Sequence, residues 1–188
     1  MKMPILKINN LSSSEEFVQF WANLYAEAEK EYYYDDNIGK ELMPKGVQEL
    51  YLWKNGGNFS KGKKKTVENN FIAKIEDVNR LDKDILPKDF LNKFSEGGAI
   101  WRIFFLHIWQ PKRYPIYDQH VHRAMMFLRD GKKEEISTQD PEKIETYLAD
   151  YLPFYAGFKD DGKRSVDRAL WTFGKFLKSP FEKMLDIE

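Results

Sequence analysis

A short polar segment near the middle of the chain carries the residue types best suited to chemistry. Asp118 is followed closely by His120, His122 and Arg123. A carboxylate can stabilise a developing positive charge or deprotonate a water molecule. The two histidines would point to different faces of a helix, which makes them a poor pair of metal ligands. We therefore take Asp118 as the candidate catalytic residue and predict no metal site, with His120 and Arg123 as supporting residues, His120 buried and His122 exposed.

A catalytic carboxylate needs a rigid mount, and the sequence around Asp118 predicts one. Residues 99–109 are apolar nearly all round, which indicates a buried helix that ends before Pro111. Pro115 restrains the segment that follows, and Asp118 then begins another helix. The same carboxylate is also suited to a plain N-cap, and this alternative stays open. The residues expected on the inner face of the new helix are Val121, Ala124, Met125 and Leu128.

The rest of the chain predicts helices joined by short connections, with few strand signals. Residues 59–65 are expected to form a basic loop. The other helices are expected to begin near Ser12, near Pro44, at Thr66, at Pro87, at Asp140 and at Arg164. We therefore predict an all-α fold with two lobes, one from residues 1–43 plus 130–188 and one from residues 44–129.

The composition narrows the class of protein. The 188 residues include 30 basic and 30 acidic side chains, so the net charge of zero gives no support to nucleic-acid binding but allows a local basic face. The lack of cysteine excludes disulfides, iron–sulfur clusters and thiolate zinc sites. No signal peptide and no apolar run of about 18–20 residues is present, so we expect a cytoplasmic protein without a membrane partner.

The order of these features resembles the helix-hairpin-helix DNA glycosylases. Phe94-Ser-Glu-Gly-Gly98 stands where that family has a glycine-containing hairpin, approximately Leu-Pro-Gly-Val-Gly. Ile116-Tyr-Asp-Gln-His-Val-His-Arg123 stands where the family has Val-Asp-Thr-His-Val-x-Arg. The spacing between the two motifs is the one expected for the family. The resemblance covers about residues 94–124, and residues 44–75 more loosely.

The resemblance implies a two-lobed fold and a monofunctional glycosylase that removes a damaged or modified base from double-stranded DNA, leaving an abasic site. Cleavage of a base–sugar bond passes through an oxocarbenium-like sugar, which Asp118 would stabilise while it orients the attacking water. Some members attack the sugar with a lysine after the hairpin. Ile100 stands at that position, so no lyase step is expected. No cofactor is implied, and we expect a monomer.

The resemblance also assigns DNA contacts. Backbone N–H groups of Gly97, Gly98 and Ala99 would hold a phosphate, although Glu96 replaces the first glycine of the family's hairpin. Asn55 stands where the family has the wedge that fills the gap left by the flipped base, or it is a helix C-cap.

Two further groups of residues have open alternatives. Lys61, Lys63, Lys64 and Lys65 would contact phosphates or belong to a solvated surface. Trp53, Trp101 and Tyr33 would line a base pocket or pack in the core. Residues 164–168 are expected to hold a salt-bridge network between helices. The alternative to the enzyme is a non-catalytic helical module that binds DNA or protein, which the altered hairpin and the zero net charge favour.

Overall fold

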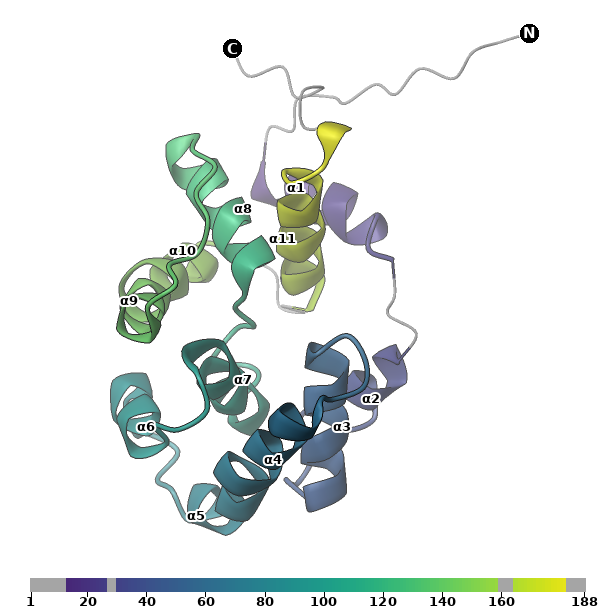
Figure 1. Cartoon of the computed structure of the whole chain (residues 1–188). Helices are drawn as coiled ribbons and strands as arrows, with labels where there is room; N and C mark the ends of the chain where they lie inside the picture. Colours follow the sequence, from purple (N-terminus) through teal and green to yellow (C-terminus); the bar gives the residue numbers. More distant parts are fainter. Residues whose placement is uncertain (1–12, 27–29, 159–163, 182–188) are drawn as a thin grey trace, which may run out of the picture. The chain divides into compact units, whose positions relative to one another are not determined.

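The computed structural model describes residues 13–26, 30–158 and 164–181, and within these residues it contains helices and no strands (Figure 1). The predicted all-α class is confirmed. Within the same described residues, no helix has both the length and the apolar character needed to cross a membrane.

The chain divides into two units. The first unit comprises Met1–Tyr25, Asp118–Ile136 and Phe154–Glu188. The second unit comprises Ala26–Tyr117 and Ser137–Pro153. Each unit has its own set of packed helices, and each is described separately below.

These units correct the expected lobe boundaries, 1–43 plus 130–188 and 44–129. Helix α2 (Glu31–Asp35) packs on α3 (Pro44–Lys54), so it belongs to the second unit rather than to an N-terminal lobe. Helix α8 (Gln119–Asp130) packs against α11 (Arg164–Phe176) and therefore joins the first unit. Sequence patterns locate helices along the chain, but the pairing of helices depends on tertiary contacts.

In the first unit, α11 lies between α1 (Ser14–Asn23) and α8 (Figure 1). Ser13 begins α1 as predicted, because its hydroxyl accepts a hydrogen bond from the Glu16 backbone N–H at 3.2 Å. The buried apolar residues of the three helices include Phe17, Val18, Trp21, Val121, Ala124, Met125, Val166, Leu170 and Phe173. Burial of these side chains stabilises the unit through the hydrophobic effect.

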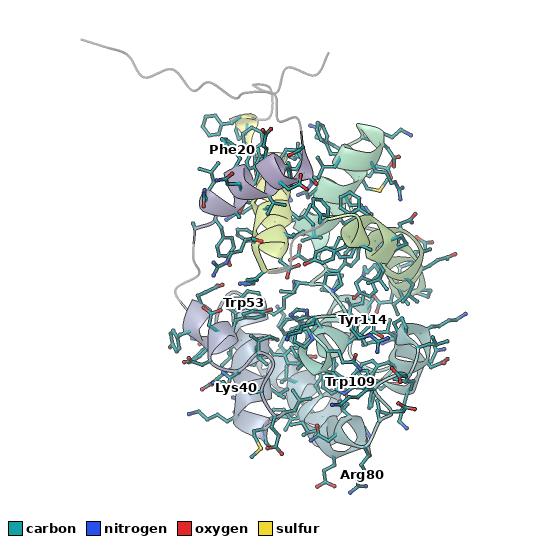
Figure 2. The ribbon with its side chains drawn as sticks, turned by 180° about the vertical axis from the view of Figure 1, so that it is seen from behind. Phe20, Lys40, Trp53, Arg80, Trp109 and Tyr114 are labelled. Carbon is teal, nitrogen blue, oxygen red and sulfur yellow. The ribbon has the colours of Figure 1, made fainter. Side chains whose placement is uncertain are left out.

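In the second unit, α7 (Ala99–Trp109) is the most deeply buried helix, as its apolar sequence predicts. Figure 2 shows the side chains of this unit, among them Trp109 at the end of α7 and Tyr114 just beyond it. The remaining elements are α4 (Lys61–Asn70), a 3₁₀ turn (Ile72–Lys74), α5 (Ile75–Asn79), α6 (Pro87–Lys93), α9 (Asp140–Thr146) and a π-helical turn (Tyr147–Tyr151). Helix α10 (Leu152–Ala156) spans the boundary between the units. Of these helices, α6 and α9 pack against α7.

The predicted basic loop over residues 59–65 is wrong, because α4 already begins at Lys61. The Ser60 hydroxyl accepts a hydrogen bond from the Lys63 backbone N–H at 3.3 Å, which is an N-cap that the lysine-rich composition obscured. The helix expected to begin at Thr66 is in fact the later part of α4, which the 3₁₀ turn and α5 follow.

Two predictions about the faces of α8 are also wrong. Leu128, expected inside, is 39% exposed, whereas His122, expected outside, is only 6% exposed. The buried arc of α8 is wide near its start and covers every residue from Val121 to Met126. Burial lowers the pKa of the His122 side chain, because a desolvated imidazole favours its neutral form.

Candidate functional site

The backbone just before α8 is held by buried side chains of the second unit. Three successive carbonyl groups, those of residues 114–116, accept hydrogen bonds from His107 Nδ1 at 2.6 Å, Tyr147 Oη at 3.3 Å and Tyr151 Oη at 3.1 Å. Because a carbonyl cannot donate, His107 carries its proton on Nδ1, and its Nε2 accepts from the Tyr34 hydroxyl at 2.8 Å. The segment is therefore fixed by side-chain donors rather than by proline alone.

Asp118 is the N-cap of α8 and belongs to the first unit. Its Oδ1 atom accepts hydrogen bonds from the backbone N–H groups of His120 at 2.9 Å and of Val121 at 3.1 Å. The residue is half-buried and stands at the positive end of the α8 dipole. The cap that the sequence left open as an alternative is thus present, and it fixes the orientation of the carboxylate.

Arg123 clamps the start of α8 within the first unit. The residue is 2% exposed, and its guanidinium donates to both carboxylate oxygens of Glu135, at 2.8 and 2.7 Å from Nη2. A further bond of 2.8 Å reaches the Gly174 carbonyl of α11. Hydrogen bonding to Arg123 lowers the pKa of Glu135. Arg123 therefore links α8 to the segment that follows it and to α11.

Because Gly174 has no side chain, the backbone of α11 packs directly against the backbone of α8 at His120. A Cβ atom on Gly174 would lie 1.8 Å from the His120 carbonyl oxygen, so no larger residue fits without moving a helix. This close approach fixes the position of His120 relative to α11.

Aromatic rings of the first unit gather around Trp171 of α11. The Trp171 ring centre lies 5.5 Å from that of His120 and 5.4 Å from that of Tyr25, both in edge-on arrangements. The Lys175 ammonium lies 4.5 Å from the Trp171 ring centre. His120, expected to be buried, is half-buried in this cluster. The cluster therefore begins two residues after Asp118 on α8.

The turn between α6 and α7 does require its two glycines. Gly97 and Gly98 have φ angles of 100° and 73°, which disfavour residues with a side chain. A Cβ atom on Gly97 would also lie 2.7 Å from the Phe71 ring. The glycines singled out from the sequence are therefore needed for the shape of this turn.

A carboxylate already occupies the start of α7. Asp140, at the start of α9, accepts a hydrogen bond from the Ala99 backbone N–H. It also forms an ion pair with Lys143, whose Nζ lies 2.8 Å from the Asp140 Oδ1 atom. Lys143, and then this backbone bond, lower the pKa of Asp140. The N–H group of Ala99 that the resemblance assigns to a phosphate thus binds an anionic group of the chain itself.

An open hollow of about 370 Å³ lies beside this turn, within the second unit. It is lined by Lys63, Thr66, Asn70, Gly97, Gly98, Ala99, Ile100, Trp101, Asp140 and Lys143. Of the three predicted base-pocket residues, only Trp101 lines it. Tyr33 packs against Tyr32, and the Trp53 indole N–H donates to Glu31 at 2.8 Å.

Asn55 and Lys63 have local structural roles in the second unit. Asn55 is the C-cap of α3, and its amide donates to the backbone carbonyls of Gly57 and Asn58 at 3.2 and 3.1 Å. Its side-chain oxygen accepts a 2.7 Å bond from Lys63 Nζ. The C-cap that was the alternative to a wedge is therefore present. The other predicted contact lysines, Lys61, Lys64 and Lys65, are exposed on α4.

The sequence alone did not assign Tyr25, Trp171 or Lys175 to a site, and it assigned Arg168 only to a salt-bridge network. Arg168, Trp171 and Lys175 recur on α11 at helical spacing, which was the available signal. Arg164 and Arg168, expected in a salt-bridge network, lie with their guanidinium carbons 5.8 and 5.1 Å from the centre of the Tyr25 ring.

Comparisons with protein-family models, with curated proteins and with solved structures find no match to this chain. Among the residues that the structure describes, no group of three or more His, Asp or Glu side chains is arranged to hold a metal ion.

Proposed function

We propose that this chain is a monofunctional DNA N-glycosylase with a two-lobed helix-hairpin-helix fold, acting as a cytoplasmic monomer on double-stranded DNA that carries a damaged or modified base. The observation that supports this proposal most is the way in which the Asp118 carboxylate is held at the start of α8. Two backbone N–H groups fix its half-buried carboxylate, and a basic and aromatic face of the same unit adjoins it. The motif resemblance over residues 94–124 supplies the reaction class.

In the proposed reaction, water attacks the sugar carbon C1′ while the bond from C1′ to the base nitrogen breaks. The base leaves with the bonding electrons and takes up a proton, and the sugar becomes an abasic site. Asp118 faces the positive charge that develops on the sugar and accepts the proton of the attacking water. A carboxylate fixed beforehand by the α8 backbone loses little energy to reorientation as the charge develops.

In the second unit, the side chains of α4 would make the contacts with DNA. Because Asp140 fills the start of α7, the hairpin offers one backbone donor fewer to a phosphate. Lys61, Lys64 and Lys65 are exposed, and they would provide the positive charge that attracts the DNA backbone.

A panel of duplexes that each carry one modified base tests the proposal. The panel includes alkylated purines, oxidised purines and hypermodified bases. We expect release of one class of base and an intact abasic strand that breaks only after alkali or heat, because Ile100 offers no amine. An adduct trapped by borohydride would contradict the absence of a lyase step. Release of no base from any duplex would contradict the glycosylase.

One observation favours a second candidate, a non-catalytic helical module that binds DNA or a protein. Asp140 bonds the Ala99 N–H group that a glycosylase hairpin would offer to a phosphate. Such a module would bind a partner without releasing a base from any duplex of the panel.

A further inference from the structure

Helix α11 carries a basic and aromatic stripe that the reaction proposed above does not use. Arg164, Arg168, Trp171 and Lys175 follow one another at intervals of four, three and four residues, which places them on one side of the helix. Residues on another side of α11, such as Val166, Leu170 and Phe173, are buried against the first unit. The first three residues of the stripe are half-buried and Lys175 is exposed, so the stripe reaches the surface.

Two residues of the same unit extend the stripe, one just after α1 and one on α8. Tyr25 packs edge-on against Trp171 and lies beneath both arginines, and His120 packs edge-on against Trp171 from α8. The backbone N–H of His120 donates to Asp118 Oδ1 at 2.9 Å. We call these six residues, Tyr25, His120, Arg164, Arg168, Trp171 and Lys175, the α11 face. It ends one hydrogen bond away from the candidate catalytic carboxylate.

The α11 face carries three cations, and two of them, Arg164 and Arg168, lie about one helical turn apart. Asp167 supplies a negative charge in the same turn, but it is buried, whereas the three cations of the stripe reach the surface. This surface therefore favours an anionic partner.

The aromatic members narrow the class of that partner. A partner that carries phosphates alone would need cations but no rings. Nucleic acid offers phosphates to the cations and flat bases to the rings, and stacking tolerates any base because every base has a π-face. The ammonium of Lys175 covers one face of Trp171. Since Lys175 is long and exposed, its ammonium can turn to a phosphate and uncover that face.

We propose that the α11 face binds unpaired nucleotides of a DNA strand, with Arg164, Arg168 and Lys175 on the phosphates and Trp171 against a base. This inference rests on the proposed function, because it names the surface that would hold the DNA strand beside Asp118. It does not depend on that function for its test, because binding is measured without catalysis.

Binding of a fluorescent ten-residue oligothymidylate to the full-length protein, followed by anisotropy at several salt concentrations, tests the inference. We expect Trp171→Leu to weaken binding about tenfold, since stacking on one aromatic side chain contributes about 1–3 kcal/mol per base. Trp171→Phe keeps a ring and should retain most of the affinity. Arg168→Gln should flatten the slope of log affinity against log salt by about 0.7, the value for one phosphate contact with single-stranded DNA.

Lys132→Gln is the matched control, because Lys132 is an exposed lysine of the same unit outside the α11 face. It should leave both affinity and slope nearly unchanged. Inorganic polyphosphate, which has charge but no bases, should compete weakly and equally with the parent and with Trp171→Leu. Thermal unfolding of each variant identifies a loss of fold, and Trp171→Phe with Arg168→Gln still tests the inference if Trp171→Leu does not fold.

The outcomes separate this inference from the proposed function. Binding that depends on Trp171 and Arg168, without release of a base from any modified duplex, would uphold the α11 face and contradict the glycosylase. Base release by the parent, together with parental binding and release by both variants, would uphold the glycosylase and overturn the α11 face. Equal oligothymidylate affinities for the parent, Trp171→Leu, Arg168→Gln and Lys132→Gln would also overturn it.

Discussion

The starts of α7 and α8 both bind a carboxylate, but the two carboxylates come from different places in the chain. Asp118 precedes α8 directly and caps it through Oδ1, whereas Asp140 comes from α9 to bond Ala99 at the start of α7. The α8 cap is local and is accompanied by the close approach of α11. The α7 cap depends on the packing of α9. The proposed catalytic group, Asp118, is therefore held by its own helix, whereas Asp140 links α9 to α7. We call this second contact the tie at α7.

The largest expected effect comes from disturbing the support of α8. Gly174→Ala places a methyl group 1.8 Å from the His120 carbonyl oxygen, so α11 must move away from α8. We expect a loss of roughly 3 kcal/mol in unfolding free energy, at the upper end of the usual cost of overpacking. Gly62→Ala on α4 is the control, because a Cβ atom there meets nothing within 4 Å. Equal thermal stability of the two variants would refute the close approach.

A smaller effect follows from removing the tie at α7. Asp140→Asn loses the ion pair with Lys143 and weakens the bond from Ala99. Because the Asp140 side chain is 42% exposed, solvent screens the pair, and we expect a loss of about 0.5 kcal/mol.

The same tie predicts a dependence on pH. The folded state lowers the pKa of Asp140, so its contribution is present above the unfolded value of about 3.9 and is lost as the pH falls through the lower folded value. Unfolding free energies measured between pH 2 and pH 6 should therefore fall less steeply at acid pH for Asp140→Asn than for the parent. Parallel curves would contradict the tie.

The smallest effect per residue is expected on α4. Replacing Lys64 and Lys65 by Ala should flatten the salt dependence of duplex affinity by about 0.9 per lost phosphate contact. Lys112→Ala, at an exposed lysine of the same unit outside α4, is the control. A duplex affinity that does not change with salt would remove the case for DNA contact by these lysines.

Local signals in the sequence predicted the helix starts well. Ser13, Pro44, Pro87 and Asp118 each act through residues within one helical turn, so their roles follow from nearby residue types. The start of α4 was missed because Ser60 stands before a run of lysines that looks like a loop.

Contacts between distant residues account for what the sequence did not reveal. The bond from Ala99 to Asp140 and the hydrogen bond from Trp53 to Glu31 each join two helices. The hydrogen bonds to the carbonyls of residues 114–116 join helices to the segment before α8. No local pattern specifies these pairs. The stripe on α11 was within reach, because its spacing is visible in the sequence, but only the contacts with Tyr25 and His120 connect it to Asp118.

The central claim is that the Asp118 carboxylate, fixed at the start of α8, takes part in breaking the base–sugar bond. Asp118→Asn keeps the capping oxygen and removes the charge, so thermal stability should change little while the single-turnover rate of base release falls by about 100-fold or more. Asp130→Asn, at the other end of α8, is the matched control and should release the base at the parental rate. Base release by Asp118→Asn at the rate of Asp130→Asn would contradict the claim.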